Sequence, residues 1–301
     1  MELEENNIKI CRVTLKVLHY SLMWPRKKYE LTGSWNYVKI AFFFLILVPW
    51  CSTVIMHLVM AFKNDLNMSE DVALTCCFCG LSYMIFAFVK NQPKTASLLR
   101  DLSNFKKFGM PPGFANLDKT LNFGSLCAYL YTALGIVAYC SAKTINQPEC
   151  KKISNRNGVK EICGLPTAVW IPIDVNYFPI FQLVYFYIFV SMQMFLKAAL
   201  MISYMVLEIT HHMVLRIKHL EQLIFDCFRD EQDCEIQRKQ FAKCILYHKE
   251  ILEFARRTND CFSADMFAHL AMTAAICGCL QKQFIDVSTK VILIDKVAFA
   301  K

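Results

Sequence analysis

Charged residues are scarce in this chain: Asp, Glu, Lys and Arg make up 19% of its 301 residues, where a soluble domain usually carries about 25%. They are absent altogether from residues 40–62. As an α-helix this run would be roughly 34 Å long, which is enough to cross a hydrocarbon core of about 30 Å. The scarcity therefore indicates a membrane protein rather than a soluble domain.

Further apolar runs of membrane length follow the first, at residues 72–89, 121–142 and 177–197. A weaker run at 262–280 contains Asp265 and His269, which lie one helical turn apart and could pair to ease entry into lipid. These runs predict an all-α membrane protein, a polytopic helical bundle with about five spans.

Sequence motifs of enzymes are missing. The chain has no glycine-rich phosphate loop, no nucleophile elbow and no HExxH helix. His211-His212 with His219 form one histidine cluster, whereas a membrane di-iron site needs several. The cysteine triplet that begins at Cys76 has no second cluster to complete a tetrahedral zinc site. We expect no catalytic activity, no cofactor and no metal.

Basic residues predict the orientation. With residues 1–37 in the cytosol, the segments on the cytosolic side of the first four spans hold thirteen Lys and Arg, and the outer loops hold six. This bias favours a cytosolic N-terminus. The net charge of +8 collects beside span ends, which is typical of membrane proteins, so we expect no nucleic-acid partner.

The two predicted outer loops carry extracellular features. Asn67 begins an Asn-Met-Ser glycosylation pattern in the first loop, at residues 63–71. Cys150 and Cys163 share the second loop, at residues 143–176, where a disulfide could persist. Both features agree with the orientation from the basic residues.

Residues 208–261 form a long polar insert with helical periodicity, interrupted by a charged, turn-like stretch at 229–238. Its first helix carries a stripe at Val214, Ile217, Glu221, Ile224 and Phe228. Its second carries a stripe at Phe241, Cys244/Ile245, His248, Ile251/Leu252 and Ala255. Two interpretations stay open: the stripes pack against each other, or they form a platform for subunit association.

Aromatic and small residues occupy the outer halves of the second to fourth spans. Apolar and aromatic walls with a few hydroxyls suit a small volatile ligand, which binds through shape and dispersion. Any one of these side chains can instead pack against a neighbouring helix or lipid, so the region is predicted more firmly than its members. The candidate ligand-binding residues are Phe78, Tyr83, Tyr131, Gly135, Tyr139, Phe181, Tyr185 and Phe189.

Five short motifs occur in a fixed order along residues 10–277. They are Leu22-Met23-Trp24-Pro25, Leu165-Pro166 through Trp170-Ile171-Pro172-Ile173-Asp174, His212-Met213-Val214-Leu215-Arg216, Tyr247-His248-Lys249-Glu250-Ile251-Leu252 and Asn259-Asp260-Cys261-Phe262-Ser263. Each is weak by itself. In this order, and with this topology, the chain resembles the insect odorant receptor family.

The resemblance implies a seven-span, multi-pass protein in the plasma membrane of olfactory sensory neurons. It implies the ligand-binding subunit of a heteromeric, odorant-gated, non-selective cation channel, whose partner is an olfactory co-receptor and whose ligand is a small volatile odorant. Because the family's cytosolic helices make the main subunit contact, the resemblance favours association through residues 208–261. The expected contact residues are Phe241, Ile245, His248 and Leu252.

The chain departs from the family after Gly278, where no run is long enough to cross a bilayer. We therefore expect a C-terminally truncated receptor with about five of seven spans, a partial fifth span at 262–280 and a divergent tail at 281–301. One alternative is a non-conducting membrane protein that associates with the co-receptor. A gustatory receptor is another alternative, but the Trp-Pro-Asp pattern of Trp170 to Asp174 favours olfaction.

Overall fold

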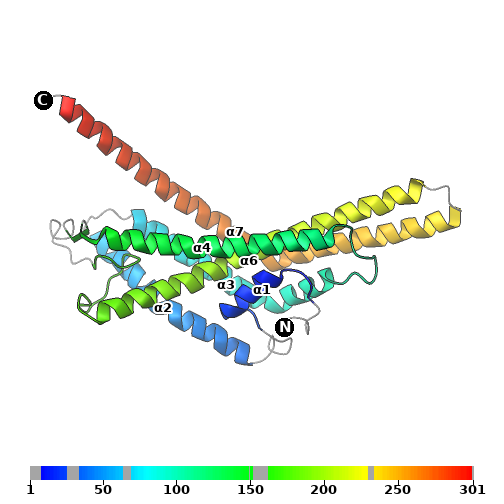
Figure 1. Cartoon of the computed structure of the whole chain (residues 1–301), viewed down its shortest axis with the longest axis horizontal. Coiled ribbons are helices and arrows are strands. Elements are labelled where there is room, and N and C mark those ends of the chain that lie inside the picture. Colours follow the sequence, from blue (N-terminus) through cyan, green and yellow to red (C-terminus); the bar gives the residue numbers. More distant parts are fainter. Residues whose placement is uncertain are drawn as a thin grey trace. The chain divides into compact units, whose positions relative to one another are not determined.

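The computed structural model describes residues 8–25, 34–63, 69–148, 150–151, 162–229 and 234–299. In this part of the chain the secondary structure is helical, with no strand (Figure 1). The helices are α1 (Arg12–Tyr20), α2 (Ser34–Lys63), α3 (Ser69–Leu102), α4 (Phe114–Ile145), α6 (Ile180–Arg229) and α7 (Cys234–Phe299).

Five of the described helices are long and apolar enough to cross a membrane. Their apolar windows are mostly not buried within the chain, and large hydrophobic side chains such as Leu45, Leu130 and Leu183 are exposed on them. Apolar surface of this kind is stable against lipid. The predicted all-α, polytopic fold with five spans is therefore confirmed. The candidate spans are Tyr37–Phe62, Asp71–Leu102, Phe114–Ile145, Ile180–Arg229 and Cys234–Cys279.

Two helix boundaries differ from the sequence-based expectation. α7 begins at Cys234, inside the stretch expected to be turn-like, and it runs unbroken past the expected start of a fifth span at residue 262. No Gly or Pro lies near that position to end the helix. The expected pair of Asp265 and His269 is also wrong, because the Asp265 carboxylate and Nδ1 of His269 have no hydrogen-bond partner.

Contacts divide the chain into two units, and the long helices run through both. Unit 1 comprises residues 1–40, 85–131 and 197–266, and unit 2 comprises residues 41–84, 132–196 and 267–301. Each unit has its own buried interior, which is described separately below.

In unit 1, the short helix α1 is fixed by its buried face. Leu15 and Leu18 are fully buried, and the Thr14 hydroxyl lies 2.8 Å from the hydroxyl of Ser125 on α4. The Val13 amide donates to Asn122 Oδ1 at 3.1 Å. These polar contacts, in an otherwise apolar interface, satisfy groups that would be costly to bury unpaired.

The turn after α1 contains the Leu-Met-Trp-Pro motif, and its centre is buried in unit 1. Gln92 on α3 donates its side-chain amide to the carbonyl of Met23. The ring of Trp24 lies 6.1 Å from that of Phe88, centroid to centroid. The motif therefore anchors the N-terminal segment to α3.

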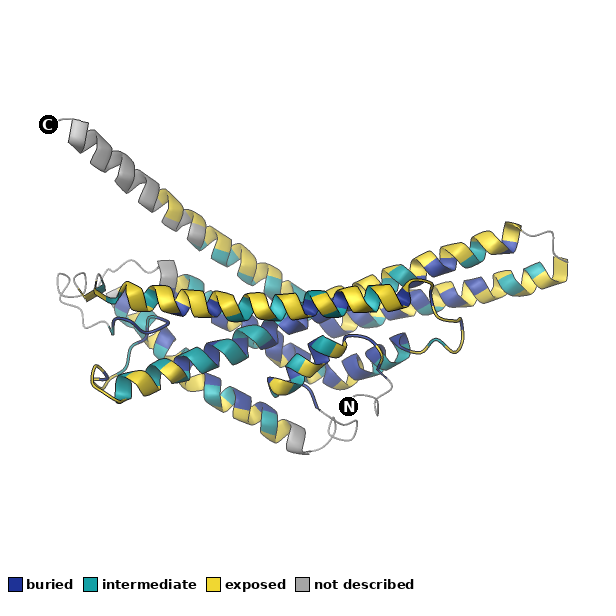
Figure 2. Cartoon of the chain, viewed as in Figure 1, coloured by how far each residue is buried: buried dark blue, intermediate teal, exposed yellow. Residues whose placement is uncertain are grey.

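Also in unit 1, the end of α6 and the start of α7 form an antiparallel hairpin, here residues 212–229 with 234–258 (Figure 1). Facing contacts join Met213 with Thr258, Arg216 with Phe254, His219 with Tyr247, Cys227 with Cys244 and Phe228 with Phe241. On α7 the contacting residues are three, four or seven positions apart, which keeps them on one side of that helix. In Figure 2 exposed and buried residues are interspersed along both helices.

The hairpin buries a different stripe of α6 from the one expected. Val214, Ile217 and Phe228 are exposed, whereas Leu220 and Cys227 are buried. The buried cluster consists of Phe108, Leu220, Cys227, Cys244, Tyr247 and Ile251. Most of the first stripe therefore faces outward, although Ile224 packs against the cluster and Phe228 meets Phe241. Of the second stripe, Cys244 and Ile251 point inward while Ile245 and Leu252 point outward.

In unit 2, an aromatic cluster of Trp50 (α2), Phe78 (α3) and Phe195 (α6) forms the centre. The rings of Trp50 and Phe78 meet edge to face at 4.3 Å, and Phe195 lies 5.5 Å from Phe78 and 6.2 Å from Trp50. Each of the three side chains is at most 4% exposed. Aromatic groups in this arrangement contribute beyond their buried area, so the cluster fixes three helices to one another.

Candidate functional site

The second predicted outer loop packs as a strap on unit 2. Within residues 162–179, the run 163–167 and Val169 are buried. The Thr167 hydroxyl accepts a hydrogen bond from the indole N–H of Trp50 at 3.0 Å. The amide of Trp170 donates to the carbonyl of Thr53 at 3.1 Å. The strap is thus bonded to α2 at two points, and one of them is Trp50 of the aromatic cluster.

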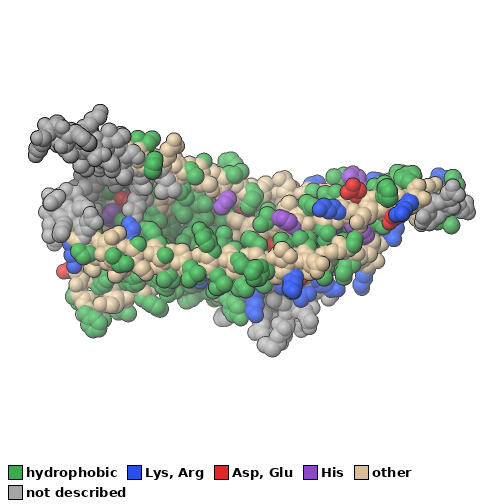
Figure 3. Space-filling view, turned by 45° about the horizontal axis from the view of Figure 1, so that its top comes forward, with side chains coloured by type: hydrophobic (Ala, Val, Ile, Leu, Met, Phe, Trp, Pro, Cys, Tyr) green, Lys and Arg blue, Asp and Glu red, His purple; other side chains and the backbone are tan. Residues whose placement is uncertain are grey.

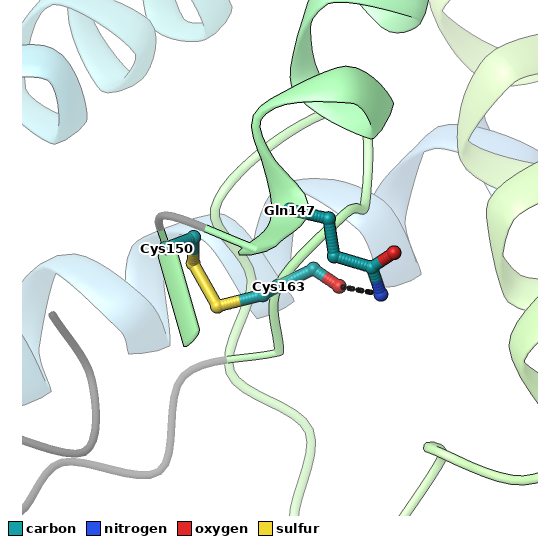
Figure 4. The surroundings of a disulfide bond; sticks show 3 residues. All are labelled: Gln147, Cys150 and Cys163. Atoms are coloured by element: carbon teal, nitrogen blue, oxygen red, sulfur yellow. Dashed lines mark hydrogen bonds between the residues drawn. A yellow bond between two sulfur atoms is a disulfide. The ribbon is translucent and has the colours of Figure 1, made fainter. Parts of the chain in front are cut away.

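The N-terminal end of the strap, at Cys163, is held covalently. A disulfide joins Cys150 to Cys163 with a Cα–Cα distance of 5.8 Å (Figure 4). Beside it, the side-chain amide of Gln147 donates to the Cys163 carbonyl at 3.2 Å. The strap therefore connects the end of α4 with α2.

The candidate ligand-binding residues differ widely in exposure. Phe78 is buried in the aromatic cluster, and Phe181, Tyr185 and Phe189 are half-buried along one face of α6. The remaining four are exposed, namely Tyr83, Tyr131, Gly135 and Tyr139. Tyr131 lies in unit 1 and the other seven lie in unit 2. Their role in ligand binding stays a prediction.

Sequence reasoning missed Trp50 and Phe195, which contact Phe78 from α2 and α6, and Thr167 of the strap, which is bonded to Trp50. Trp50 and Phe195 lie inside uniformly apolar runs, where periodicity does not distinguish an inner face from a lipid face. Thr167 lies in a loop, and its role as an anchor of the strap is evident only from its buried hydroxyl, which is bonded to Trp50. The Leu165-to-Asp174 motif was the one signal near it.

The predicted subunit-contact residues lie on the outside of the hairpin. Phe241, Ile245 and Leu252 are 41%, 45% and 56% exposed, and His248 is exposed as well. The inner face of α7 is formed by their neighbours Cys244, Tyr247, Ile251 and Phe254. Apart from Phe241, whose ring also meets Phe228 of α6, these residues lie outside the buried cluster of the hairpin.

A buried arginine, missed by sequence reasoning, joins the hairpin to the end of α3. Arg216 donates from Nη2 to the carbonyls of Leu102 at 2.6 Å and Asn104 at 3.4 Å. Its guanidinium carbon lies 5.1 Å from the ring centres of both Phe105 and Phe254. A cation here satisfies the last carbonyls of α3 and complements its helix dipole.

Further contacts join the same elements of unit 1. Arg257 on α7 donates to Asp101 at 2.9 Å and to Ser97 at 3.1 Å. The ring of Phe108, in the loop after α3, stacks on Tyr247 at 4.3 Å. The end of α3 and the loop that follows it are therefore clamped to the hairpin.

Lys and Arg gather over the hairpin in Figure 3, while hydrophobic side chains cover most of the described part of unit 2 on the face shown.

The comparisons with known proteins agree with this architecture. No curated protein matches the chain. Among solved structures, the olfactory receptor OR5 of Machilis hrabei in complex with eugenol matches with a TM-score of 0.60 at 14% identity, over 90% of this chain and 69% of that one. A second structure of the same receptor matches with a TM-score of 0.58 at 14% identity, over 89% of this chain and 69% of that one. At this identity, the likeness shows a shared fold.

A family model described as 7tm Odorant receptor matches residues 67–300. The match spans α3, α4, α6 and α7, and it continues through 281–300, where we expected a divergent tail. It covers well over half of the chain and agrees with the family that the five motifs indicated. The chain therefore belongs to the insect odorant receptor family.

Proposed function

We propose that this odorant receptor is the ligand-binding subunit of a heteromeric, odorant-gated cation channel in the plasma membrane of olfactory sensory neurons. The proposal takes the N-terminus and the hairpin to be cytosolic, as the basic residues favour. The observation that carries it is the outer face of the hairpin, defined here as the association face: Phe241, Ile245, His248 and Leu252.

The association face combines apolar exposure with a rigid support. Its residues lie on consecutive turns of α7, and the opposite side of that helix is packed against α6 and Phe108. Contiguous exposed apolar groups on a rigid polar element are typical of a protein contact surface. An aqueous location leaves no lipid to cover them, so a second subunit is the partner that fits. We propose the olfactory co-receptor for this role.

Replacing Phe241 and Leu252 together with serine is expected to reduce co-purification with the co-receptor at least tenfold. Burying each side chain contributes about 1.5–3 kcal/mol, and 1.4 kcal/mol corresponds to a factor of ten in affinity. The measurement is affinity capture of tagged receptor from cells that express both subunits. Tyr20→Ser, at an exposed aromatic of α1, serves as the control and should capture normally. Equal capture by the double variant and wild type would refute the association face.

For the odorant we propose the half-buried face of α6 in unit 2 formed by Phe181, Tyr185 and Phe189. These residues recur every four positions, so they lie on one side of the helix. The Thr144 hydroxyl on α4 donates to the Tyr185 hydroxyl at 3.5 Å, which places polar groups beside two aromatic rings. Apolar walls with few polar groups are typical of sites for small ligands.

Phe189→Ala is expected to raise the half-maximal concentration of an activating volatile about tenfold or more. Loss of one buried aromatic contact removes roughly 1.5–3 kcal/mol of binding energy. The assay is odour-evoked current in cells that express this chain with the co-receptor, screened with a panel of small aromatic and aliphatic alcohols, esters and ketones. Phe186→Ala is the matched control, since Phe186 lies on the same helix and is 65% exposed. Equal shifts in both variants would place the ligand elsewhere, and co-purification without current would indicate a non-conducting partner.

A further inference from the structure

Two thiols meet inside the hairpin of unit 1. The sulfur atoms of Cys227 on α6 and Cys244 on α7 lie 3.9 Å apart. Both residues are free cysteines, and both belong to the buried cluster with Tyr247 and Leu220. A disulfide requires a sulfur–sulfur distance near 2.0 Å, so the two atoms need to approach by about 2 Å. Rotation of the two side chains supplies movements of this size.

The fold holds these cysteines opposite each other. On one side of the pair, His219 Nδ1 lies 3.4 Å from the Tyr247 hydroxyl, and on the other the rings of Phe228 and Phe241 lie 5.8 Å apart. The side-chain amide of Gln237 donates to the carbonyl of Cys227 at 2.8 Å and adds a third link across the hairpin. The facing position of the two sulfur atoms thus follows from the helix register.

The pair fits redox chemistry better than metal binding. A structural zinc site needs four ligands, and no group of three or more His, Cys, Asp or Glu side chains within the described ranges is arranged to hold a metal ion. Cys227 lies two residues before the last residue of α6, Arg229. Helix ends open locally more easily than helix centres, and opening of the last turn of α6 would uncover Cys227 and the Cys244 thiol that it faces.

We propose that Cys227 and Cys244 form a redox-sensitive pair that a small hydroperoxide closes to a disulfide. One thiolate attacks the peroxide O–O bond and becomes a sulfenic acid, with release of water or an alcohol. The second thiolate then attacks the sulfenic sulfur and releases water. The two thiols lose two electrons in total, and the peroxide gains them. A thiol reductant reverses the reaction by disulfide exchange.

The disulfide would bridge the two helices just before the tip of the hairpin. It would close a loop of 17 residues in sequence separation, and a cross-link of this length restricts the unfolded chain substantially. The association face begins at Phe241, one helical turn from Cys244. Oxidation would therefore fix the backbone that presents this face, but the proposal does not depend on association.

The test uses the full-length chain, purified in detergent after reduction. Hydrogen peroxide is added in steps, remaining thiols are alkylated, and linked peptides are mapped by mass spectrometry without reduction. The expected result is a Cys227–Cys244 link at lower peroxide than any other link except Cys150–Cys163. Oxidised wild type should also unfold a few degrees higher than reduced wild type, and a reductant should remove this increase.

Two variants separate this link from general thiol oxidation. Cys227→Ser should abolish the link, leave Cys244 open to alkylation and show a smaller oxidant-dependent rise in melting temperature than wild type, because only Cys150–Cys163 re-forms in this variant. Cys234→Ser removes an exposed cysteine at the start of α7 and should leave the link intact. The proposal is overturned when wild type, without any substitution, links other cysteines first or keeps this pair reduced while Cys234 is fully oxidised.

Discussion

Replacing Arg216 with methionine is expected to destabilise the protein by about 4 kcal/mol, since hydrogen bonds from a charged donor are worth about 1.5–3 kcal/mol each. The guanidinium is 2% exposed and donates to the carbonyls of Leu102 and Asn104. Methionine fills a similar volume but removes both hydrogen bonds, and it leaves the carbonyl of the buried Leu102 without this donor. It also ends the contact of a cation with the rings of Phe105 and Phe254, worth roughly 1–2 kcal/mol.

The measurement for Arg216→Met is the thermal unfolding of the detergent-solubilised protein, where a fall on the order of 10 °C is expected. Arg216→Lys should fall between wild type and Arg216→Met, because an ammonium keeps the charge but not the planar fork. Arg256→Met is the matched control: this arginine of α7 is 67% exposed and paired with Glu253, and its loss should change the melting temperature by about one degree at most. Equal melting temperatures for the two methionine variants would contradict a stabilising role of Arg216.

Replacing Trp50 with alanine is expected to destabilise the protein by about 4 kcal/mol, the range found for large buried aromatics. The indole is the common neighbour of Phe78 and Phe195, and its N–H is bonded to Thr167. Alanine leaves a void between α2, α3 and α6, and it releases the strap from one of its two anchors on α2. The melting temperature should fall on the order of 10 °C.

A second substitution distinguishes packing from hydrogen bonding at this position. Trp50→Phe keeps a ring but leaves the Thr167 hydroxyl unpaired, so a loss of about 1–2 kcal/mol is expected. Phe42→Ala on the same helix is the control, because Phe42 is 53% exposed and its removal opens no internal void. Were Trp50→Ala no less stable than Phe42→Ala, the aromatic cluster would not be the centre of unit 2.

The fold was largely predictable from the distribution of charge. Runs without charged residues predicted helices of membrane length, and the structure has candidate spans over each of them. The order of five motifs predicted the family that the model match then identified. The asparagine of the glycosylation pattern, Asn67, lies outside the described residues, so that prediction stays open.

The inner face of the hairpin was not predictable, and α6 shows why. Two apolar stripes, one through Val214 and Ile217 and one through Leu220 and Cys227, both satisfy the three-four spacing. Periodicity finds such stripes but does not choose between them. Each stripe is a possible partner for α7, and the choice depends on what else must be buried.

The sequence by itself therefore determined the helices, their membrane character and the family, because these follow from the local density of charge and from short motifs. Only the tertiary structure decided which side chains face inward. The end of α3 presents carbonyls that need a donor, and Phe105 and Phe108 need a surface to cover them. The stripe that carries Arg216 meets both needs. It is the stripe that is buried because leaving the buried carbonyls of α3 without a donor would cost free energy.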